Sequence, residues 1–162
     1  MQAGQFRFKR TDIWREGEWL DLWSVVHLLS GVSTGFALYV VHFGASASLV
    51  LAFVLFVAYE LWEAMVRIKE TPANRFMDVV VGMVGFYPAF VFIAPVFSGT
   101  TFWGVFAAIL TVNIWMATLG WIASQKAAAL ERRLRARYLR GKTRARERAM
   151  RLRQKFMHRP YR

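Results

Sequence analysis

Four long apolar runs occupy most of the first three quarters of the chain. They cover residues 22–43, 46–66, 77–97 and 101–123. An α-helix rises about 1.5 Å per residue, so a run of about 20 residues matches the roughly 30 Å hydrocarbon core of a bilayer. This uniform length favours membrane-spanning helices over the buried helices of a soluble domain. The pattern predicts an all-α, polytopic membrane protein with a four-helix transmembrane bundle.

The segment before the first run is polar and rich in tryptophan. Residues 11–21 place Trp14 and Trp19 among charged side chains, a composition that suits a short helix lying in the membrane interface. A connecting loop with anchoring tryptophans is the alternative. No cleavable signal pattern precedes the first run, so we expect the first span to be retained. We therefore expect residues 1–21 to form an N-terminal cytoplasmic or interfacial segment and residues 22–124 to form the transmembrane domain.

Residues 125–162 form a basic tail after the last run. Their abundance of Ala, Leu and Arg as far as Met157 predicts a cytoplasmic helix. Gly141 and Thr143 predict a stop and a restart of this helix. Two thin apolar stripes lie on either side of that point, one made of Leu130, Leu134 and Tyr138 and the other of Leu152 and Phe156.

The basic residues predict the orientation of the four spans. All 22 Lys and Arg residues lie in the N-terminal segment, in the loop from Arg67 to Arg75 or in the tail, whereas residues 42–45 and 98–100 hold none. By the positive-inside rule, both termini and the middle loop are cytoplasmic. The two outer turns are so short that the first and second spans, and the third and fourth, are expected to be adjacent hairpins. The sequence thus predicts a multi-pass protein of the bacterial inner membrane.

Charge and apolar content are separated along the chain. The whole chain is 56% hydrophobic with a net charge of +12, yet residues 125–162 hold twelve Arg and three Lys against only Glu131 and Glu147. Cysteine is absent, which excludes disulfides, thiolate nucleophiles and zinc–thiolate sites. The chain also lacks a serine elbow, a histidine-rich metal motif and paired aspartates. These absences disfavour an intramembrane hydrolase, so we expect a binding or scaffold role without a cofactor.

Four ionisable side chains interrupt the apolar runs: His27, Glu60, Glu63 and Asp78. An ionisable residue at the centre of a span costs about 2.5 to 3.5 kcal/mol on insertion scales, so each is a candidate functional residue. With the predicted orientation, all four lie within about two turns of the cytoplasmic boundary. Residues three apart share a helix face, as Glu60 and Glu63 do. The common depth predicts one cluster.

Small residues accompany these side chains. Gly31 and Gly35 follow His27 on the first span, while Gly82 and Gly85 share a face with Asp78 on the third, and small residues allow spans to approach closely. We therefore predict a shallow polar pocket that opens to the cytoplasm, with Arg67, Lys69, Asn74 and Arg75 at its rim. Two further predictions concern helix geometry: Asn113 forms an interhelical hydrogen bond and Pro88 kinks the third span.

Structural roles are the alternatives for the same residues. Asp78 would act as the N-terminal cap of the third span, where a carboxylate is favoured by unpaired N–H groups. Glu63 would reach water at the boundary, and His27 would make a packing hydrogen bond between helices. One histidine and three carboxylates suit a divalent cation, but no motif with fixed ligand spacing is present, so no metal is predicted.

The order of these residues resembles the VanZ-like family of small bacterial membrane proteins. That family shows a His in its first span, E-x-x-Q at the end of its second, an Arg in the following loop and D-x-x-x-N-x-x-G at the start of its third. The corresponding residues here are His27, Glu60 with Glu63, Arg75, and Asp78 with Gly82 and Gly85. Glu63 stands where Gln is typical, and Gly82 stands where Asn is typical.

The resemblance covers about residues 23–85. It implies a polar pocket that faces the cytoplasm, together with a link to glycopeptide-antibiotic tolerance and other cell-envelope functions. The family has no settled activity, so the resemblance implies no particular reaction.

The tail has three interpretations. A basic segment directly after a span binds the anionic lipids of the inner leaflet at about 1 kcal/mol per basic residue. It would also dock on an acidic partner protein, or neutralise nucleic-acid phosphates. Arg preference over Lys can reflect base composition alone, which disfavours nucleic acid. The candidate docking residues are Arg132, Arg133, Arg135, Arg137, Arg140, Arg144, Arg146 and Arg148.

Three functional hypotheses follow. The first is a VanZ-like protein whose pocket around Glu60, His27 and Asp78 binds a lipid headgroup or a small ligand. The second is an accessory or scaffold subunit of a larger membrane complex, or a homo-oligomer, that docks through its basic tail. The third is a proton-coupled carrier, because intramembrane Glu and His can relay protons. Four helices are few for a carrier, and the inverted repeat typical of such folds is not visible.

Overall fold

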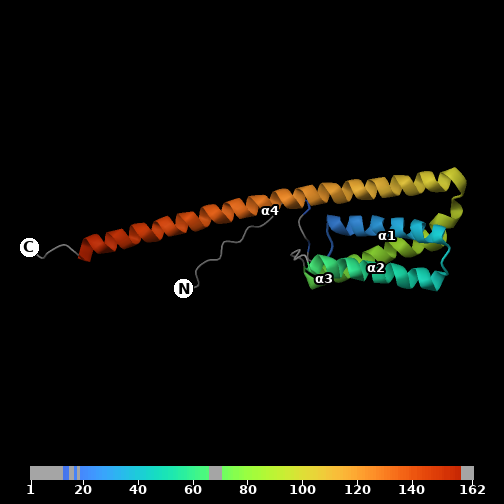
Figure 1. The fold of residues 1–162 in the computed structure, drawn as a ribbon, viewed down its shortest axis with the longest axis horizontal. Helices are drawn as coiled ribbons and strands as arrows, with labels where there is room; N and C mark the ends of the chain where they lie inside the picture. Colours follow the sequence, from blue (N-terminus) through green and yellow to red (C-terminus); the bar gives the residue numbers. More distant parts are fainter. Residues whose placement is uncertain (1–12, 15–16, 18, 66–70, 158–162) are drawn as a thin grey trace, which may run out of the picture. The chain divides into compact units, whose positions relative to one another are not determined.

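The computed structural model describes residues 13–14, 17, 19–65 and 71–157. Its helices are α1 (Leu22–Val41), α2 (Ala45–Met65), α3 (Pro72–Pro88) and α4 (Gly99–Met157) (Figure 1). A π-helical turn (Ala89–Ile93) and a 3-10 turn (Ala94–Val96) extend α3. The described residues contain no strand, and four helical stretches are long and apolar enough to cross a membrane. The predicted all-α class and the four candidate spans are confirmed.

The start of α1 is fixed by a capping box. The side chain of Asp21 accepts hydrogen bonds from the backbone N–H of Trp23 at 2.7 Å and of Ser24 at 3.3 Å, and the Ser24 hydroxyl reaches back to the backbone of Asp21. Such reciprocal bonds satisfy N–H groups that the helix itself leaves unpaired. At the other end His42 has a left-handed φ of 56°, which turns the chain toward α2.

Helix α3 begins five residues earlier than the predicted span. The Thr71 side chain caps it by accepting a hydrogen bond from the backbone N–H of Asn74 at 3.1 Å, and Pro72 occupies its first turn. Proline suits that place because its missing N–H would have no partner there. Asp78 therefore lies in the second turn of α3. The alternative that Asp78 caps this helix is wrong.

Pro88 changes the type of helix that follows it. Proline lacks the N–H that an α-helix interior uses, and the chain continues from Pro88 as a π-helical turn and then as a 3-10 turn that contains Pro95. The backbone becomes extended at Phe97. The hydrogen-bond register therefore changes after Pro88, and the kink predicted at this residue stays a prediction.

The closest helix pair is α1 with α3. A Cβ atom at Gly31 would overlap the backbone carbonyl of Gly82, and one at Gly85 would overlap the carbonyl of Leu28. The predicted close approach of the glycines is confirmed. The two helices run parallel (Figure 1), so this pair is not one of the predicted hairpins. Helix α2 packs mainly on α3 and touches α1 much less.

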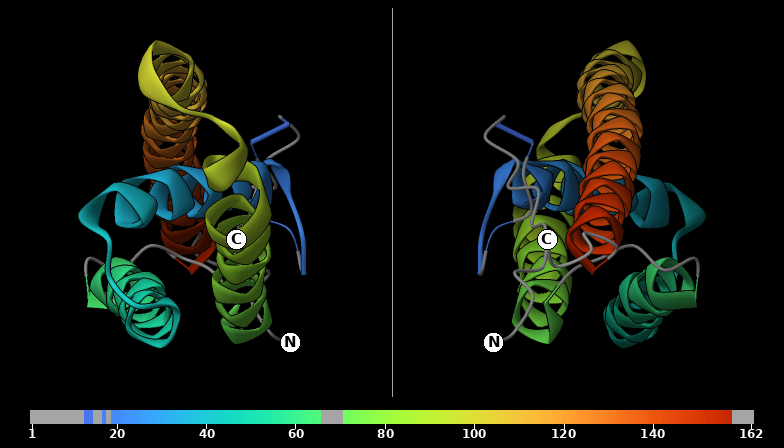
Figure 2. Two further views of the ribbon diagram at one scale, coloured as in Figure 1. Left: turned by 90° about the vertical axis from the view of Figure 1, so that its right-hand side faces the viewer. Right: turned by 90° about the vertical axis from the view of Figure 1, so that its left-hand side faces the viewer.

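Helix α1 is the centre of the four spans. Figure 2 shows it between the first part of α4 on one side and α2 and α3 on the other. The ring of Phe36 in α1 lies 5.2 Å from that of Phe102 and 5.9 Å from that of Phe106. The Asn113 side-chain amide donates to the Ser30 hydroxyl at 3.0 Å, which confirms the interhelical bond predicted for Asn113.

The N-terminal segment forms no helix where it is described. Residues 13–14 form a turn, and residues 17 and 19–21 are turn-like or extended. Trp14 is buried, with its ring 5.3 Å from that of Trp23. These residues fit the alternative of a loop anchored by tryptophans, while Thr11, Asp12 and residues 15, 16 and 18 lie outside the described residues.

The contacts of the chain divide at Ser124, and residues 124–157 belong to a separate compact unit. This part of α4 is one unbroken helix. The Thr143 hydroxyl donates to the carbonyl of Leu139 at 3.0 Å inside it. The predicted stop and restart at Gly141 and Thr143 are therefore wrong.

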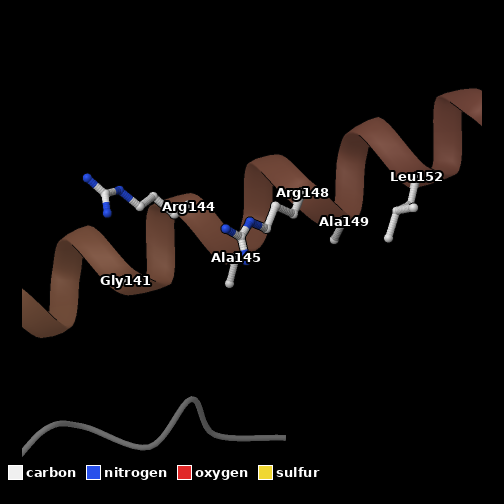
Figure 3. Close-up of a pocket in the computed structure, with 6 residues that line it drawn as sticks. All are labelled: Gly141, Arg144, Ala145, Arg148, Ala149 and Leu152. Atoms are coloured by element: carbon white, nitrogen blue, oxygen red, sulfur yellow. The ribbon is translucent and has the colours of Figure 1, made fainter.

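An unbroken tail helix unites the two predicted apolar stripes. Ala145, Ala149 and Leu152 point to one side of the helix, and the guanidinium of Arg144 points elsewhere (Figure 3). Steps of three and four residues connect eight uncharged positions on this side: Ala127, Leu130, Leu134, Tyr138, Gly141, Ala145, Ala149 and Leu152. We call this row the tail stripe.

Candidate functional site

Three ionisable side chains from three helices meet inside the four-span unit. His27 comes from α1, Glu60 from α2 and Asp78 from α3, and all three are buried. The His27 ring nitrogens face the two carboxylates, with Nδ1 3.8 Å from Glu60 Oε1 and Nε2 3.8 Å from Asp78 Oδ2. One nitrogen or oxygen atom from each residue lies within 4.8 Å of the others. We call these residues the polar cluster.

Asp78 is held by hydrogen bonds to both of its carboxylate oxygens. The Ser24 hydroxyl donates to Oδ1 at 3.0 Å, and the Asn74 amide donates to Oδ2 at 3.1 Å. The same amide lies 3.5 Å from Oδ2 of Asp21, the N-cap of α1. Asn74 is 0% exposed and Asp78 is 1% exposed. Asn74 therefore connects the start of α1 to the polar cluster.

The glycine contact between α1 and α3 brings His27 and Asp78 to the same level. His27 and Asp78 each precede a contact glycine, Gly31 and Gly82, by four residues. Residues four apart lie above one another on a helix face. Because the two helices are parallel and the glycine backbones meet, the ionisable side chains one turn earlier also meet.

Helix α2 is positioned by the same glycine. A Cβ at Gly82 would lie 3.2 Å from ring atoms of Phe56, so the missing side chain leaves room for that ring. Glu60 lies four residues after Phe56 and shares its face. The Phe56 contact therefore sets the depth at which Glu60 joins the polar cluster. The Tyr59 ring completes the surroundings, edge-on to His27 at 5.8 Å.

The structure brings together three of the five residues predicted to form the pocket. Glu63 and Arg75 are half-buried and lie three residues from Glu60 and Asp78 respectively, and Glu63 is not among the three residues whose ligand atoms converge. Ser24 was not predicted as a site residue. Asn74 was predicted at the rim of the pocket, but its hydrogen bond to Asp78 was not, although Asn74 precedes Asp78 by four residues. The eight candidate docking arginines of the tail are all exposed.

An apolar groove of about 680 Å³ lies between α2 and α3. Val57 of α2 and Val79 of α3 line it, and these residues lie three positions before Glu60 and one after Asp78. The remaining lining residues are also apolar apart from the Tyr87 hydroxyl. The same two helices thus carry acidic members of the polar cluster and an apolar groove.

The polar cluster offers two carboxylates and one imidazole. This set can bind a cation, accept hydrogen bonds from an amine or a hydroxyl, or relay a proton. The described residues around the cluster supply oriented polar groups, such as the Ser24 hydroxyl that donates to Asp78. Neither a protein-family model, nor a curated protein sequence, nor a solved structure matches this chain.

Proposed function

We propose that this chain is a VanZ-like protein of the bacterial inner membrane whose polar cluster binds a lipid headgroup or a small polar ligand in a cell-envelope function. The observation that carries the proposal is the convergence of His27, Glu60 and Asp78 from three apolar helices. Each such residue is costly to insert into a bilayer. Two supporting hydrogen bonds on Asp78 fix this costly arrangement.

The residues that carry the VanZ-like resemblance support this proposal because they coincide with the packed site. His27, Glu60 and Asp78 form the polar cluster, and Gly82 and Gly85 make the contact of α3 with α1. At position 82, where Asn is typical of the family, the missing side chain leaves room for the Phe56 ring of α2. The departure from the family pattern therefore has a packing reason.

The composition of the site favours an amphiphilic ligand. Two carboxylates attract a positively charged or hydrogen-bond-donating group, such as the amine of a lipid headgroup. The apolar groove on α2 and α3 suits an acyl chain, because ligand sites are mostly apolar with a few polar groups that orient the ligand.

The distribution of basic residues supports cytoplasmic ends, and the absence of cysteine provides a direct test. Single substitutions Gly44→Cys and Ser98→Cys mark the two predicted outer turns, and Gln125→Cys marks the start of the tail. In intact spheroplasts, we expect a membrane-impermeant maleimide to label the first two positions and to spare Gln125→Cys. Permeabilised membranes should label all three. Labelling of Gln125→Cys in intact spheroplasts would contradict the predicted orientation and place the tail outside.

A second candidate function is that of an accessory subunit that docks through its tail. The tail stripe favours it, because eight uncharged positions run along a helix whose other faces are rich in arginine. A narrow seam with steps of three and four residues is the pattern by which helices pack side by side. The flanking arginines favour an acidic partner helix, since opposite charges across an interface promote pairing.

One experiment separates the two functions. The full-length protein is purified in mild detergent, and the lipids and proteins that accompany it are identified by mass spectrometry. For a ligand-binding site, we expect a specific lipid to be enriched at least about 10-fold, a difference of about 1.4 kcal/mol in binding free energy, over Glu60→Gln/Asp78→Asn. For a docking subunit, a partner protein is retained by this double variant and lost after truncation at Ser124.

Glu147→Gln is the matched control, because it makes the same chemical change on the exposed tail. It should keep the lipid of the wild type. An identical lipid profile for the wild type and Glu60→Gln/Asp78→Asn would refute the ligand-binding proposal, provided that both proteins elute as single peaks in size-exclusion chromatography.

A further inference from the structure

We propose that the polar cluster is a binding site for one divalent transition-metal cation. The inference rests on the proposed function insofar as that function makes the cluster a binding site, and it names an occupant. Nitrogen and carboxylate oxygen ligands suit zinc, manganese or ferrous iron, whereas soft thiolate ligands are absent from this chain.

The spacing of the ligand atoms fits such an ion. Cations of this class bind nitrogen and oxygen at about 2.0 to 2.2 Å, which places neighbouring ligands roughly 3 to 4 Å apart. One ligand atom from each of His27, Glu60 and Asp78 lies within 4.8 Å of the others. The two distances of 3.8 Å join different nitrogens of the His27 ring to the carboxylates, Nδ1 to Glu60 and Nε2 to Asp78, and only one of these nitrogens would bind the ion. Both distances exceed those of hydrogen bonds between the same atoms, and an ion held by all three residues would draw the more distant carboxylate toward the nitrogen that binds it.

The surroundings of Asp78 are those of an oriented metal ligand. Carboxylates that bind metals are themselves hydrogen-bonded, and these outer partners fix the ligand's orientation. Here the Ser24 hydroxyl and the Asn74 amide each hold one oxygen of Asp78, and Asn74 is positioned in turn by Asp21. Ser24 and Asn74 are not ligands themselves, and their hydrogen bonds hold Asp78 in place apart from the distances between the three ligand residues.

Burial favours a cation beside the two carboxylates. The three ligand residues are each less than 9% exposed, so water reaches the two carboxylates very little. A divalent cation would neutralise two carboxylates that are otherwise costly in a span.

The test uses the full-length protein in detergent, stripped with a chelator and then exposed to ZnCl₂ or MnCl₂. Metal retained after desalting is measured by inductively coupled plasma mass spectrometry, and binding is followed by the shift in thermal unfolding. We expect about one equivalent of retained metal and a higher unfolding temperature, since a ligand specific for the folded state stabilises it. Absence of retained metal with both salts would overturn the inference.

Two kinds of variant locate the ion. Glu60→Gln and His27→Gln each remove one ligand while nearly preserving side-chain size, and we expect them to lose the bound equivalent. Ser24→Ala leaves all three ligands in place, and we expect affinity to fall about 10- to 100-fold, as for outer partners of known metal ligands. Full metal retention by Glu60→Gln and His27→Gln would overturn the site even if the wild type binds metal.

His42→Gln is the control, because His42 is exposed and outside the cluster. Circular dichroism of each variant shows whether the helices are intact. Lipid content measured before and after chelation separates this inference from the proposed function. If the protein retains lipid but binds no metal, the metal site is refuted and the proposed function stands. If it binds metal but retains no specific lipid, only the headgroup proposal is refuted.

Discussion

Gly31→Ala is expected to destabilise the four-span unit by about 3 kcal/mol or more, at the upper end of the usual cost of overpacking. The added methyl group would overlap the backbone carbonyl of Gly82. A flexible side chain could rotate away from such a clash, but a backbone carbonyl within a helix cannot. Helices α1 and α3 must therefore separate, and this separation also removes His27 from Asp78. Thermal unfolding followed by size-exclusion chromatography measures the effect.

Gly104→Ala is the matched control for this substitution. A Cβ at Gly104 in α4 would meet none of the described atoms within 4 Å. There we expect no loss, and up to about 1 kcal/mol of gain, because alanine favours helix over glycine. Equal unfolding temperatures for Gly31→Ala and Gly104→Ala would contradict the close packing of α1 on α3.

Asn74→Asp is expected to destabilise the protein by about 3 to 5 kcal/mol, the range for leaving a buried charge uncompensated. The substitution preserves shape but replaces the amide that donates to Asp78 and lies 3.5 Å from Asp21. The new carboxylate would face both acidic groups at a site that is 0% exposed. The start of α1 would then separate from α3. Hydrogen exchange of the first turns of both helices measures this opening.

Gln125→Glu makes the same amide-to-carboxylate change at an exposed position of α4. It should leave exchange in α1 and α3 unchanged. If Asn74→Asp behaves like Gln125→Glu, Asn74 does not hold the two helices together.

The spans could be predicted because their cause is simple. A helix that crosses the hydrocarbon core of a bilayer needs about 20 consecutive, mostly apolar residues. Hydropathy along the chain shows such runs directly. The depth of His27, Glu60 and Asp78 followed from the same count of turns. Their convergence needed only the assumption that costly residues at one depth face each other.

The hydrogen bond between Asn74 and Asp78 was missed because hydropathy gives a poor boundary for α3. The apolar run begins near Met77, whereas the helix begins at Pro72, capped by Thr71. A threonine followed by proline is itself a start signal. With that start, Asn74 and Asp78 are one turn apart on the same face, and their hydrogen bond could have been predicted.

Helix partners and the tail show two other limits. Small residues on α1 predicted a close approach but not its partner, because a short turn favours α2 while the matching glycines lie on α3. In the tail, Gly141 predicted a break, yet a glycine costs a helix only about 1 kcal/mol. The surrounding Ala, Leu, Arg and Lys residues favour helix strongly enough to continue it.

The parallel pairing of α1 with α3 has a consequence for biosynthesis. Proteins are made from the N-terminus, so His27 enters the bilayer two spans before Asp78 is synthesised. A nascent chain that ends after α2 holds His27 and Glu60 but lacks both Asp78 and the glycines that draw α3 onto α1. The first span therefore acquires its partner only when the third span is complete. The polar cluster can form only after all three of its helices have been inserted.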